Sequence, residues 1–289
     1  MKMADSHPQL QTIALSLSPN IGAATMKNLQ DHFNGDLDAV LAAPRRELMK
    51  VSGVGQKIAG EIAAIDLDLL APELAAWGER GVKALLRGEA GYPALLAEDD
   101  DSPPALFASR ALPEEAWASS VAIVGTRVPS KTARYLTLEL ALKLARAGRT
   151  VVSGLALGID AAAHSGALAE GGLTVAALGS GILNVYPEAN RALAERIRMS
   201  GALVSEVHPR WGANAQRLVS RNRIISGLSR AVIVVESKHD GGAMYCARFA
   251  QEQGRPVYTF DLPASGNQRL IKGGAGVLRR DDPLRDLRG

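Results

Sequence analysis

Short apolar runs alternate with longer helical stretches through the second part of the chain, and this alternation limits the possible folds more than any other feature. The apolar runs are rich in valine, and most of them end in Gly, Ser or Thr. Regular alternation of strand and helix is typical of repeated βαβ units and a parallel sheet. Strands without a polar face fit a sheet that helices cover on both sides. The apolar runs lie at residues 119–126, 148–156, 173–181, 202–209, 230–237 and 255–263, and the helical stretches at 130–148, 160–172, 188–201 and 242–254.

We therefore predict an α/β fold in which residues 119–289 form an extended Rossmann-like, doubly wound, mostly parallel sheet. Residues 1–80 have the pattern of short helices, with a long helical run from Gln56 to Arg80, and predict a small all-helical domain before the sheet. Residues 91–110 contain three prolines and the acidic run 99–101. We expect residues 81–118 to be an irregular connector leading into the sheet domain.

The composition is that of a folded protein. Of the 289 residues, 47% are hydrophobic and 22% are charged, which excludes a wholly disordered chain. The single cysteine, Cys246, excludes an intrachain disulfide and a zinc site of the Cys-x-x-Cys kind. The N-terminus has no signal-peptide pattern and no stretch is long enough to cross a membrane. We expect a soluble, cytoplasmic protein.

Charge is distributed unevenly along the chain. Residues 1–110 hold 10 Lys and Arg against 15 Asp and Glu, whereas residues 111–289 hold 23 against 15. A basic domain suits a polyanion such as nucleic acid or nucleotides, although ordinary solubilising charge remains an alternative. Aromatic residues make up only 4% of the chain, which argues against a platform of many exposed rings.

The turns after the predicted strands are the best candidates for a binding site, because ligands of open parallel sheets bind beyond the carboxyl ends of the strands. Glycines there let backbone N–H groups approach a phosphate, and Arg127 and Lys131 add positive charge. The first turn, GTRVPS, matches neither the dinucleotide fingerprint nor the P-loop, so NAD binding and ATP hydrolysis lose support. No nucleophile elbow and no paired-histidine metal motif is present.

Two groups of residues each allow a structural and a functional interpretation. Asp160 and His164 are spaced i, i+4 on a predicted helix, as a catalytic or metal pair could be. A helix cap and a structural histidine are favoured over that interpretation. In Arg221-Asn222-Arg223, one arginine could form a salt bridge with Glu206 while the other meets a phosphate.

Taken together, these segments resemble the DNA-processing protein A (DprA/Smf) family. The resemblance runs from about Val121 to Ala275 through VAIVGTR, VVSGLALGIDAAAHSGAL, GGLTVAALGSGILNVYPEAN, GALVSE, RNRIISGLS, AVIVVES, GRPVYTF and LIKGGA. It implies a cytoplasmic homodimer that binds single-stranded DNA, protects incoming strands during natural transformation and helps to load the RecA recombinase. It implies no catalytic turnover, no cofactor, no metal and no membrane partner.

The resemblance also implies which residues contact or shape the site for single-stranded DNA. Tyr186 is a candidate base platform, although a Tyr-Pro step is more often local packing. Contacts of this kind carry little sequence information, so binding should be sequence-tolerant and salt-dependent. The implied residues are Gly125, Thr126, Arg127, Lys131, Ser153, Gly154, Gly158, Asp160, His164, Gly179, Gly181, Tyr186, Pro187, Asn190, Arg221, Asn222 and Arg223.

The sequence departs from the family pattern in several places. Val219-Ser220 stands where many relatives have Phe-Pro, and Asp240-Gly241-Gly242 replaces a Ser-Gly-Ser turn and adds a negative charge. Many relatives end in a winged-helix domain, whereas this sequence stops at RRDDPLRDLRG, too short for one, so we expect that module to be absent here, either naturally or by truncation. The N-terminal helices resemble the SAM-like or helix-hairpin-helix region of relatives, with VSGVGQKIAGEI as the hairpin. Residues 1–80 hold 7 basic and 10 acidic residues, which favours a scaffold or protein-contact role over DNA binding.

Two other functions remain open. Related Rossmann-like proteins cleave nucleoside monophosphates at the N-glycosidic bond, and Glu206 or Glu236, at strand ends, could supply the catalytic carboxylate. The fold also allows a nucleotide sensor that signals through the helical domain. The dimer surface is expected within residues 230–275, where Met244, Tyr245 and Phe249 are either contact or core residues.

Overall fold

A computed structural model describes residues 8–287, so the N-terminal segment in which no signal-peptide pattern was found lies outside it. The N-terminal part is helical, as predicted, and packs around its own small apolar core. The predicted long helical run is two helices instead, because the Asp66 side chain caps the second one by accepting from the backbone N–H groups of Asp68 and Leu69. The helices are α1 (Pro8–Ser16), α2 (Ala23–His32), α3 (Leu37–Ala42), α4 (Arg45–Leu48), α5 (Gln56–Ala63) and α6 (Leu67–Glu79).

The described residues beyond α6 form a nine-stranded sheet, which confirms the α/β prediction. Its strand order is β1-β2-β6-β5-β4-β3-β7-β8-β9, and all neighbours from β6 to β9 are parallel. Strands β1 and β2 form an antiparallel edge. The strands are β1 (Lys83–Leu86), β2 (Ala105–Ala108), β3 (Val121–Val124), β4 (Val151–Ser153), β5 (Thr174–Ala177), β6 (Ala202–Ser205), β7 (Val232–Val234), β8 (Val257–Phe260) and β9 (Gly276–Leu278).

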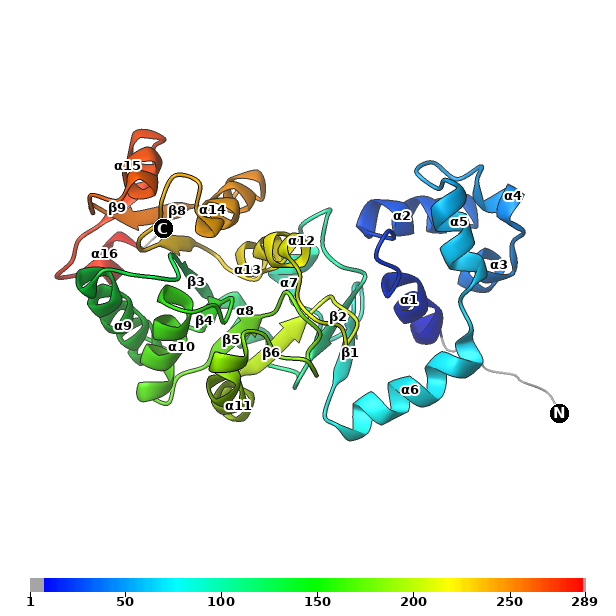
Figure 1. The fold of residues 1–289 in the computed structure, drawn as a ribbon, viewed down its shortest axis with the longest axis horizontal. Helices are drawn as coiled ribbons and strands as arrows, with labels where there is room; N and C mark the ends of the chain where they lie inside the picture. The colour runs from blue at the N-terminus through cyan, green and yellow to red at the C-terminus, as the bar shows by residue number, and fades with distance from the viewer. Residues whose placement is uncertain (1–7, 288–289) are drawn as a thin grey trace.

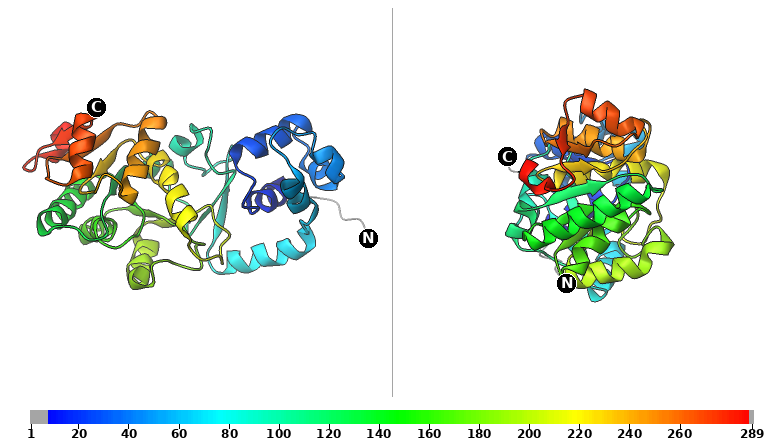
Figure 2. Two further views of the ribbon diagram at one scale, coloured as in Figure 1. Left: turned by 45° about the horizontal axis from the view of Figure 1, so that its top comes forward. Right: turned by 90° about the vertical axis from the view of Figure 1, so that its left-hand side faces the viewer.

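Helices cover both faces of this sheet, and the elongated molecule carries helices α1–α5 at one end, joined to the sheet through α6 (Figures 1 and 2). One face packs α9 (Lys131–Arg146), α10 (Ile159–Ala169) and α11 (Arg191–Ser200). The other packs α7 (Ala94–Ala97), α8 (Glu114–Ala118), α13 (Asn222–Gly227) and α14 (Gly242–Glu252). The remaining helices are η1 (Glu188–Asn190), α12 (Ala215–Ser220), α15 (Ser265–Lys272) and α16 (Pro283–Asp286).

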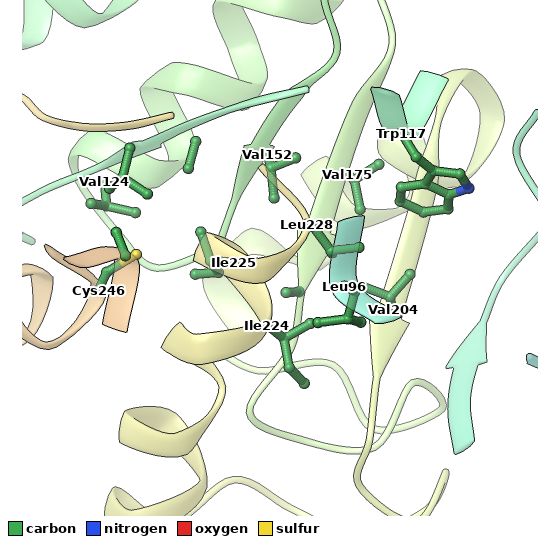
Figure 3. Packing of buried hydrophobic residues seen from close by; sticks show 14 of the residues in the cluster. Leu96, Trp117, Val124, Val152, Val175, Val204, Ile224, Ile225, Leu228 and Cys246 are labelled. Carbon is green, nitrogen blue, oxygen red and sulfur yellow. The ribbon is translucent and has the colours of Figure 1, made fainter. Parts of the chain in front are cut away.

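Burial on both faces explains why the strands are apolar at successive positions. In β3, Ala122 and Val124 belong to the cluster that includes α13 and α14, whereas Val121 and Ile123 belong to the cluster on the α9 and α10 side. Figure 3 shows the first of these clusters, with Ile224, Ile225 and Leu228 of the α13 segment lying against the central strands. None of the described helices has the length and apolarity needed to span a bilayer.

The expectation of an irregular connector at residues 81–118 is wrong. This segment supplies β1 and β2, and β2 pairs with β6 and extends the sheet. All four residues of β2 are buried, and the ring of Phe107 lies 5.8 Å from the ring of Trp77 in an edge-to-face arrangement. The two strands are only four residues long and lie on either side of the proline-rich acidic stretch, so no strand periodicity is visible in the sequence.

The topology places a switch point at β3. The chain proceeds from β3 to β4, β5 and β6 in one direction, then returns to add β7, β8 and β9 on the other side of β3. The turns after β3 and β7 therefore diverge at the carboxyl edge of the sheet, where open α/β sheets bind their ligands.

His164 lies within the core of α10 and makes a structural hydrogen bond, in agreement with the favoured interpretation. Its Nδ1 lies 2.7 Å from Oγ1 of Thr174, and that hydroxyl donates its own proton to the carbonyl of Val151. The hydroxyl proton is thereby committed, so Nδ1 of His164 carries the proton of this pair. Nε2 is buried without a partner among the described residues, and burial lowers the pKa of the ring to about 3.

This histidine makes stability depend on pH. Below its ordinary pKa of 6.5 the unfolded chain takes up a proton that the folded ring refuses, so stability is lost as the pH falls. The contribution should approach about 1.4 kcal/mol for each pH unit below 6.5. We expect wild type and His164→Asn to lose stability with different slopes between pH 6.5 and 4.5, the wild type more steeply, in urea unfolding. Parallel curves would contradict this prediction.

Candidate nucleic-acid interface

A groove of about 810 Å³ opens at the switch point. The turns after β3 and β7, helix α12 with the loop before it, and the side chain of Tyr186 line this groove. Of the residues predicted from the sequence, seven line it: Gly125, Thr126, Arg127, Asp160, Tyr186, Arg221 and Asn222. Gly154 and Pro187 line a small adjoining pocket that also contains Arg127, Tyr186 and Arg221.

Three exposed side chains determine what the groove offers to a ligand. Arg127 and Lys238 bring positive charge from the turns after β3 and β7. Tyr186 is 45% exposed and presents an aromatic ring between them and α12. Among the described lining residues, the one carboxylate is Asp160, which is buried beside Arg221. The accessible surface therefore combines cations with an aromatic ring, a combination that suits a single nucleic-acid strand.

Arg221 lies beneath the groove and is almost fully buried. Its Nη1 donates to the carbonyl oxygens of Gly154 and, at 2.6 Å, Ala177, which follow or end strands β4 and β5. A side chain at position 154 would overlap the guanidinium group, so only glycine allows this approach. Arg221 thus adds positive charge beneath the groove, while its Nη1 donates to the protein backbone and its Nε is buried without a partner among the described residues.

Asp160 organises the loop before α10. Its Oδ2 accepts from the backbone N–H groups of Gly154 at 3.2 Å and Ala156 at 3.3 Å. Burial raises the pKa of Asp160 and lowers the pKa of Arg221, and the opposite charge of each partner partly counters the other's shift. The residue before α10 is Gly158, so Asp160 does not cap the helix as expected and holds the β4–α10 loop instead.

The turn that carries Arg127 is held from two sides. The backbone N–H of Thr126 donates to the carbonyl of Glu236 at 2.8 Å, and the Oε2 of Glu236 accepts from the N–H of Ser130 at 2.7 Å. Gly158, at φ +79°, packs so closely that a Cβ would overlap the carbonyl oxygen of Thr126. These contacts fix where the Arg127 side chain leaves the backbone.

The other predicted residues do not line either pocket. Several support the loops from behind: the Ser153 hydroxyl donates to the carbonyl of Ile123 at 2.6 Å, and Asn190 Nδ2 donates to that of Leu155 at 2.8 Å. Lys131 is exposed at the first residue of α9. The residues of this group are Lys131, Ser153, Gly158, His164, Gly179, Gly181, Asn190 and Arg223.

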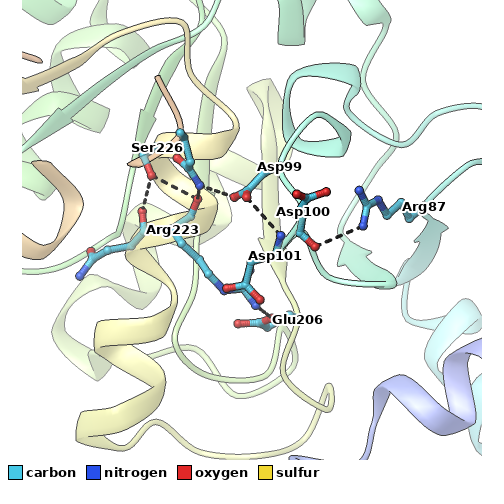
Figure 4. Close-up of polar contacts among 9 residues, drawn as sticks. Arg87, Asp99, Asp100, Asp101, Glu206, Arg223 and Ser226 are labelled. Carbon is cyan, nitrogen blue, oxygen red and sulfur yellow. Dashed lines mark hydrogen bonds and ion pairs between the residues drawn. The ribbon is translucent and has the colours of Figure 1, made fainter. Parts of the chain in front are cut away.

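Arg223 forms the salt bridge that the sequence analysis considered for one of the two arginines. Its Nη2 pairs with Oε2 of Glu206, and its Nε lies 3.1 Å from Oδ2 of Asp101 (Figure 4). Gln253 Nε2 also reaches both Asp99 Oδ2 and the carbonyl oxygen of Arg223. The acidic run 99–101 is therefore docked onto α13 and α14, and Arg223 serves as scaffold.

Sequence reasoning missed part of the groove. Lys238, Asn214, Leu218 and Val219 line it, and Lys238 is the second exposed cation. The position of Lys238 in a turn after a predicted strand could have identified it as a candidate. The residues of α12 offered no such signal, because that helix was not predicted. Asp240, expected near the rim, lies instead in a neighbouring pocket between α14 and α15. No group of three or more His, Cys, Asp or Glu side chains within residues 8–287 is arranged to hold a metal ion.

The Arg221–Asp160 pair yields a stability prediction. Arg221→Met should lower the free energy of unfolding by about 3–5 kcal/mol, because it leaves a buried carboxylate uncompensated. Adding Asp160→Asn should recover part of that loss, and Arg196→Met, at an exposed position on α11, should change it by less than about 0.5 kcal/mol. Urea unfolding of wild type, both buried single variants (Arg221→Met and Asp160→Asn), their double variant and the Arg196→Met control measures the coupling, and simple additivity of the two buried substitutions would contradict it.

Comparison with known proteins agrees with this geometry. The chain is 35% identical over 293 residues to Protein Smf of Synechocystis sp., covering 98% of this chain and 73% of that protein. It is 35% identical over 210 residues to DNA processing protein DprA of Bacillus subtilis, covering 71% of each.

Two solved structures are also similar. DprA of Streptococcus pneumoniae superposes with a TM-score of 0.77 at 27% identity, covering 94% of this chain and 95% of that one. DprA of Helicobacter pylori, described for its single-stranded DNA binding mode, gives 0.64 at 26% identity, covering 71% and 95%. The sequence profile described as DNA recombination-mediator protein A matches residues 83–287. This chain therefore belongs to the DNA recombination-mediator protein A family.

Proposed function

We propose that this protein binds single-stranded DNA in the switch-point groove, without sequence preference and without catalytic turnover. The observation that carries the proposal is the convergence of Arg127, Lys238 and Tyr186 in one groove, where the one carboxylate among the described lining residues, Asp160, is buried and faces the charge of Arg221. Cations retain the phosphate backbone, and one ring suffices for a base because every base has a stacking face. The DNA binding described for the Helicobacter pylori relative supports the same site class.

Neither glutamate considered for nucleotide cleavage is positioned as an acid or base at the groove. Glu206 is paired with Arg223, and Glu236 accepts from the backbone of Ser130. Neither carboxylate is among the residues lining the groove, so neither is positioned at a ligand held there. The geometry therefore favours binding over cleavage of a nucleoside monophosphate. A nucleotide sensor would use the same groove, and competition by free nucleotides distinguishes it.

The test is fluorescence anisotropy of a labelled oligo-dT strand and of its duplex across a salt series. Wild type should bind the single strand, and affinity should fall with salt because phosphate contacts release counterions. Arg127→Ala should weaken binding several-fold and reduce the salt slope by about 0.7, the value of one single-strand phosphate contact. Arg196→Ala, which removes an exposed cation outside the groove, serves as the control.

Absence of binding by wild type at low salt would refute the proposed function. Equal binding by Arg127→Ala and wild type would show that the turn after β3 is not part of the binding site. Strong competition by nucleoside monophosphates would favour the sensor, and release of a free base from them would favour the enzyme.

We further propose that the protein acts in the cytoplasm during natural transformation, as a homodimer that protects incoming strands and helps RecA to assemble on them. The roles in transformation and RecA loading rest on family membership, and for the dimer surface we propose the α14–α15 end of the sheet. There Tyr245 is 39% exposed beside a pocket of about 410 Å³ that also contains Met244 and Leu270.

Sedimentation should give a dimer for wild type and a shift toward monomer for Tyr245→Asp, which places a charge in this apolar contact. In the same preparation, wild type should speed RecA ATPase onset on strands coated with single-strand-binding protein. A monomeric wild type, or an unchanged lag, would refute the corresponding half of this proposal.

A further inference from the structure

A chain of stacked groups runs from the core to the surface beside the groove. The ring of Trp77, fully buried on α6, lies 5.0 Å from the ring of His208 at an interplanar angle of 85°. The ring of His208 stacks on Trp211 at 5.1 Å and 21°. The Arg217 guanidinium carbon lies 4.8 Å from the centroid of Trp211. Trp211 is 36% exposed, so the series ends in an accessible ring and cation.

The loop that carries Trp211 is held rigidly by its backbone. The carbonyl of Trp211 accepts from the N–H of Gly181 at 2.7 Å, and that of Pro209 accepts from Leu183 at 2.8 Å. A Cβ at Gly181 would overlap the carbonyl oxygens of His208 and Pro209, so glycine is needed for this close approach. Because backbone bonds fix the loop, its aromatic ring is positioned before any ligand arrives.

The cation beside Trp211 is also fixed. Arg217 Nη1 donates to the carbonyl of Gly212 at 2.7 Å, and the backbone N–H of Arg217 donates to Oδ1 of Asn214 at 2.8 Å. Only one of its guanidinium nitrogens is engaged in this bond, which leaves the planar group able to stack or to meet a phosphate. A base that stacks on an aromatic ring can gain a further cation–π contribution from a neighbouring arginine.

The charges around the stack favour an anionic ligand. Arg210 faces the carboxylate of Glu73, whose Oε1 lies 3.8 Å from both Arg210 Nε and His208 Nε2, and Arg217 adds a second positive charge beside Trp211. Burial lowers the pKa of His208, so its ring is neutral near pH 7 and acts as an aromatic spacer. The exposed end of the stack therefore carries net positive charge.

The stack adjoins the groove through the same loop. Ala213, Asn214 and Ala215, which directly follow the Trp211 turn, line the groove together with Tyr186. A strand that passes Tyr186 and leaves over the start of α12 meets Trp211 and Arg217 next.

We propose that Trp211 and Arg217 form a second nucleotide position, in which a base of the emerging single strand stacks against the ring–guanidinium pair and its phosphate meets Arg217 or Arg210. The inference rests on the proposed function and extends it, because it assigns the exit side of the DNA path. It also predicts a preference for strands long enough to span both Tyr186 and Trp211.

Intrinsic fluorescence tests this directly, because Trp211 is the exposed tryptophan of the chain's three, while Trp77 and Trp117 are fully buried. Titration of wild type with unlabelled oligo-dT should quench the emission in step with binding measured by anisotropy. Trp211→Phe should lose the quenching and bind within about threefold of wild type. Trp211→Ala should bind roughly 5- to 150-fold more weakly, the range for loss of one base stack.

Two controls isolate the stack. Tyr135→Ala removes a 63% exposed ring on α9 outside the groove and should change neither signal. A strand with an abasic stretch keeps its phosphates but offers no bases, and should bind without full quenching.

Quenching in wild type that disappears in Trp211→Phe supports the inference even if Trp211→Ala folds poorly. Tight binding by wild type without quenching overturns the inference and leaves the proposed function standing. Full quenching by the abasic strand also overturns it, in favour of phosphate capture alone. If wild type binds no single strand at all, both the function and the inference fail.

Discussion

The buried guanidinium group of Arg221 is the interaction on which the carboxyl edge of the sheet depends. It joins the carbonyl of Gly154 after β4 to that of Ala177 at the end of β5, and it faces Asp160 at the start of α10. Asp160 in turn holds the loop N–H groups of Gly154 and Ala156. Two strand-end loops and one helix therefore take their positions from the backbone hydrogen bonds of these two buried, oppositely charged groups. A buried pair of this kind adds little net stability, so its value here lies in fixing geometry.

The glycines at this edge acquire a different meaning once the structure is known. They suggested backbone N–H groups that approach a phosphate, as glycine-rich loops do elsewhere. At Gly154 the missing side chain leaves room for Arg221, and at Gly158 for the backbone of Thr126. Both glycines allow protein to pack on protein. The ligand-facing chemistry falls instead to side chains that project from the packed loops, chiefly Arg127, Lys238 and Tyr186.

The strand pattern and the turns between the elements were enough to predict the sheet and the edge that carries the groove. Valine-rich runs are buried on both faces, and carboxyl ends of parallel strands must meet at one edge, so the sequence reasoning needed no tertiary knowledge. The directions in which the neighbouring Arg221 and Arg223 side chains point could not be predicted from the sequence. Arg221 turns into the core and Arg223 turns to Glu206 and Asp101, a carboxylate more than a hundred residues away in sequence. Strands β1 and β2 escaped prediction for the same reason, since the pairing of β1 with β2 and of β2 with β6 defines them more than any local pattern does.

The acidic N-terminal part contributes to a basic groove without lining it. Trp77 of α6 packs against Phe107 of β2 and against His208, and Glu73 of the same helix faces His208 and Arg210. The β6–α12 loop is thereby fixed between α6 on one side and Gly181 on the other. The acidic helical part therefore supports this loop through packed rings, while the side chains that line the groove come from other elements. Packing thus couples α6 to the loop beside the groove, although the N-terminal part is acidic and the part that carries the groove is basic.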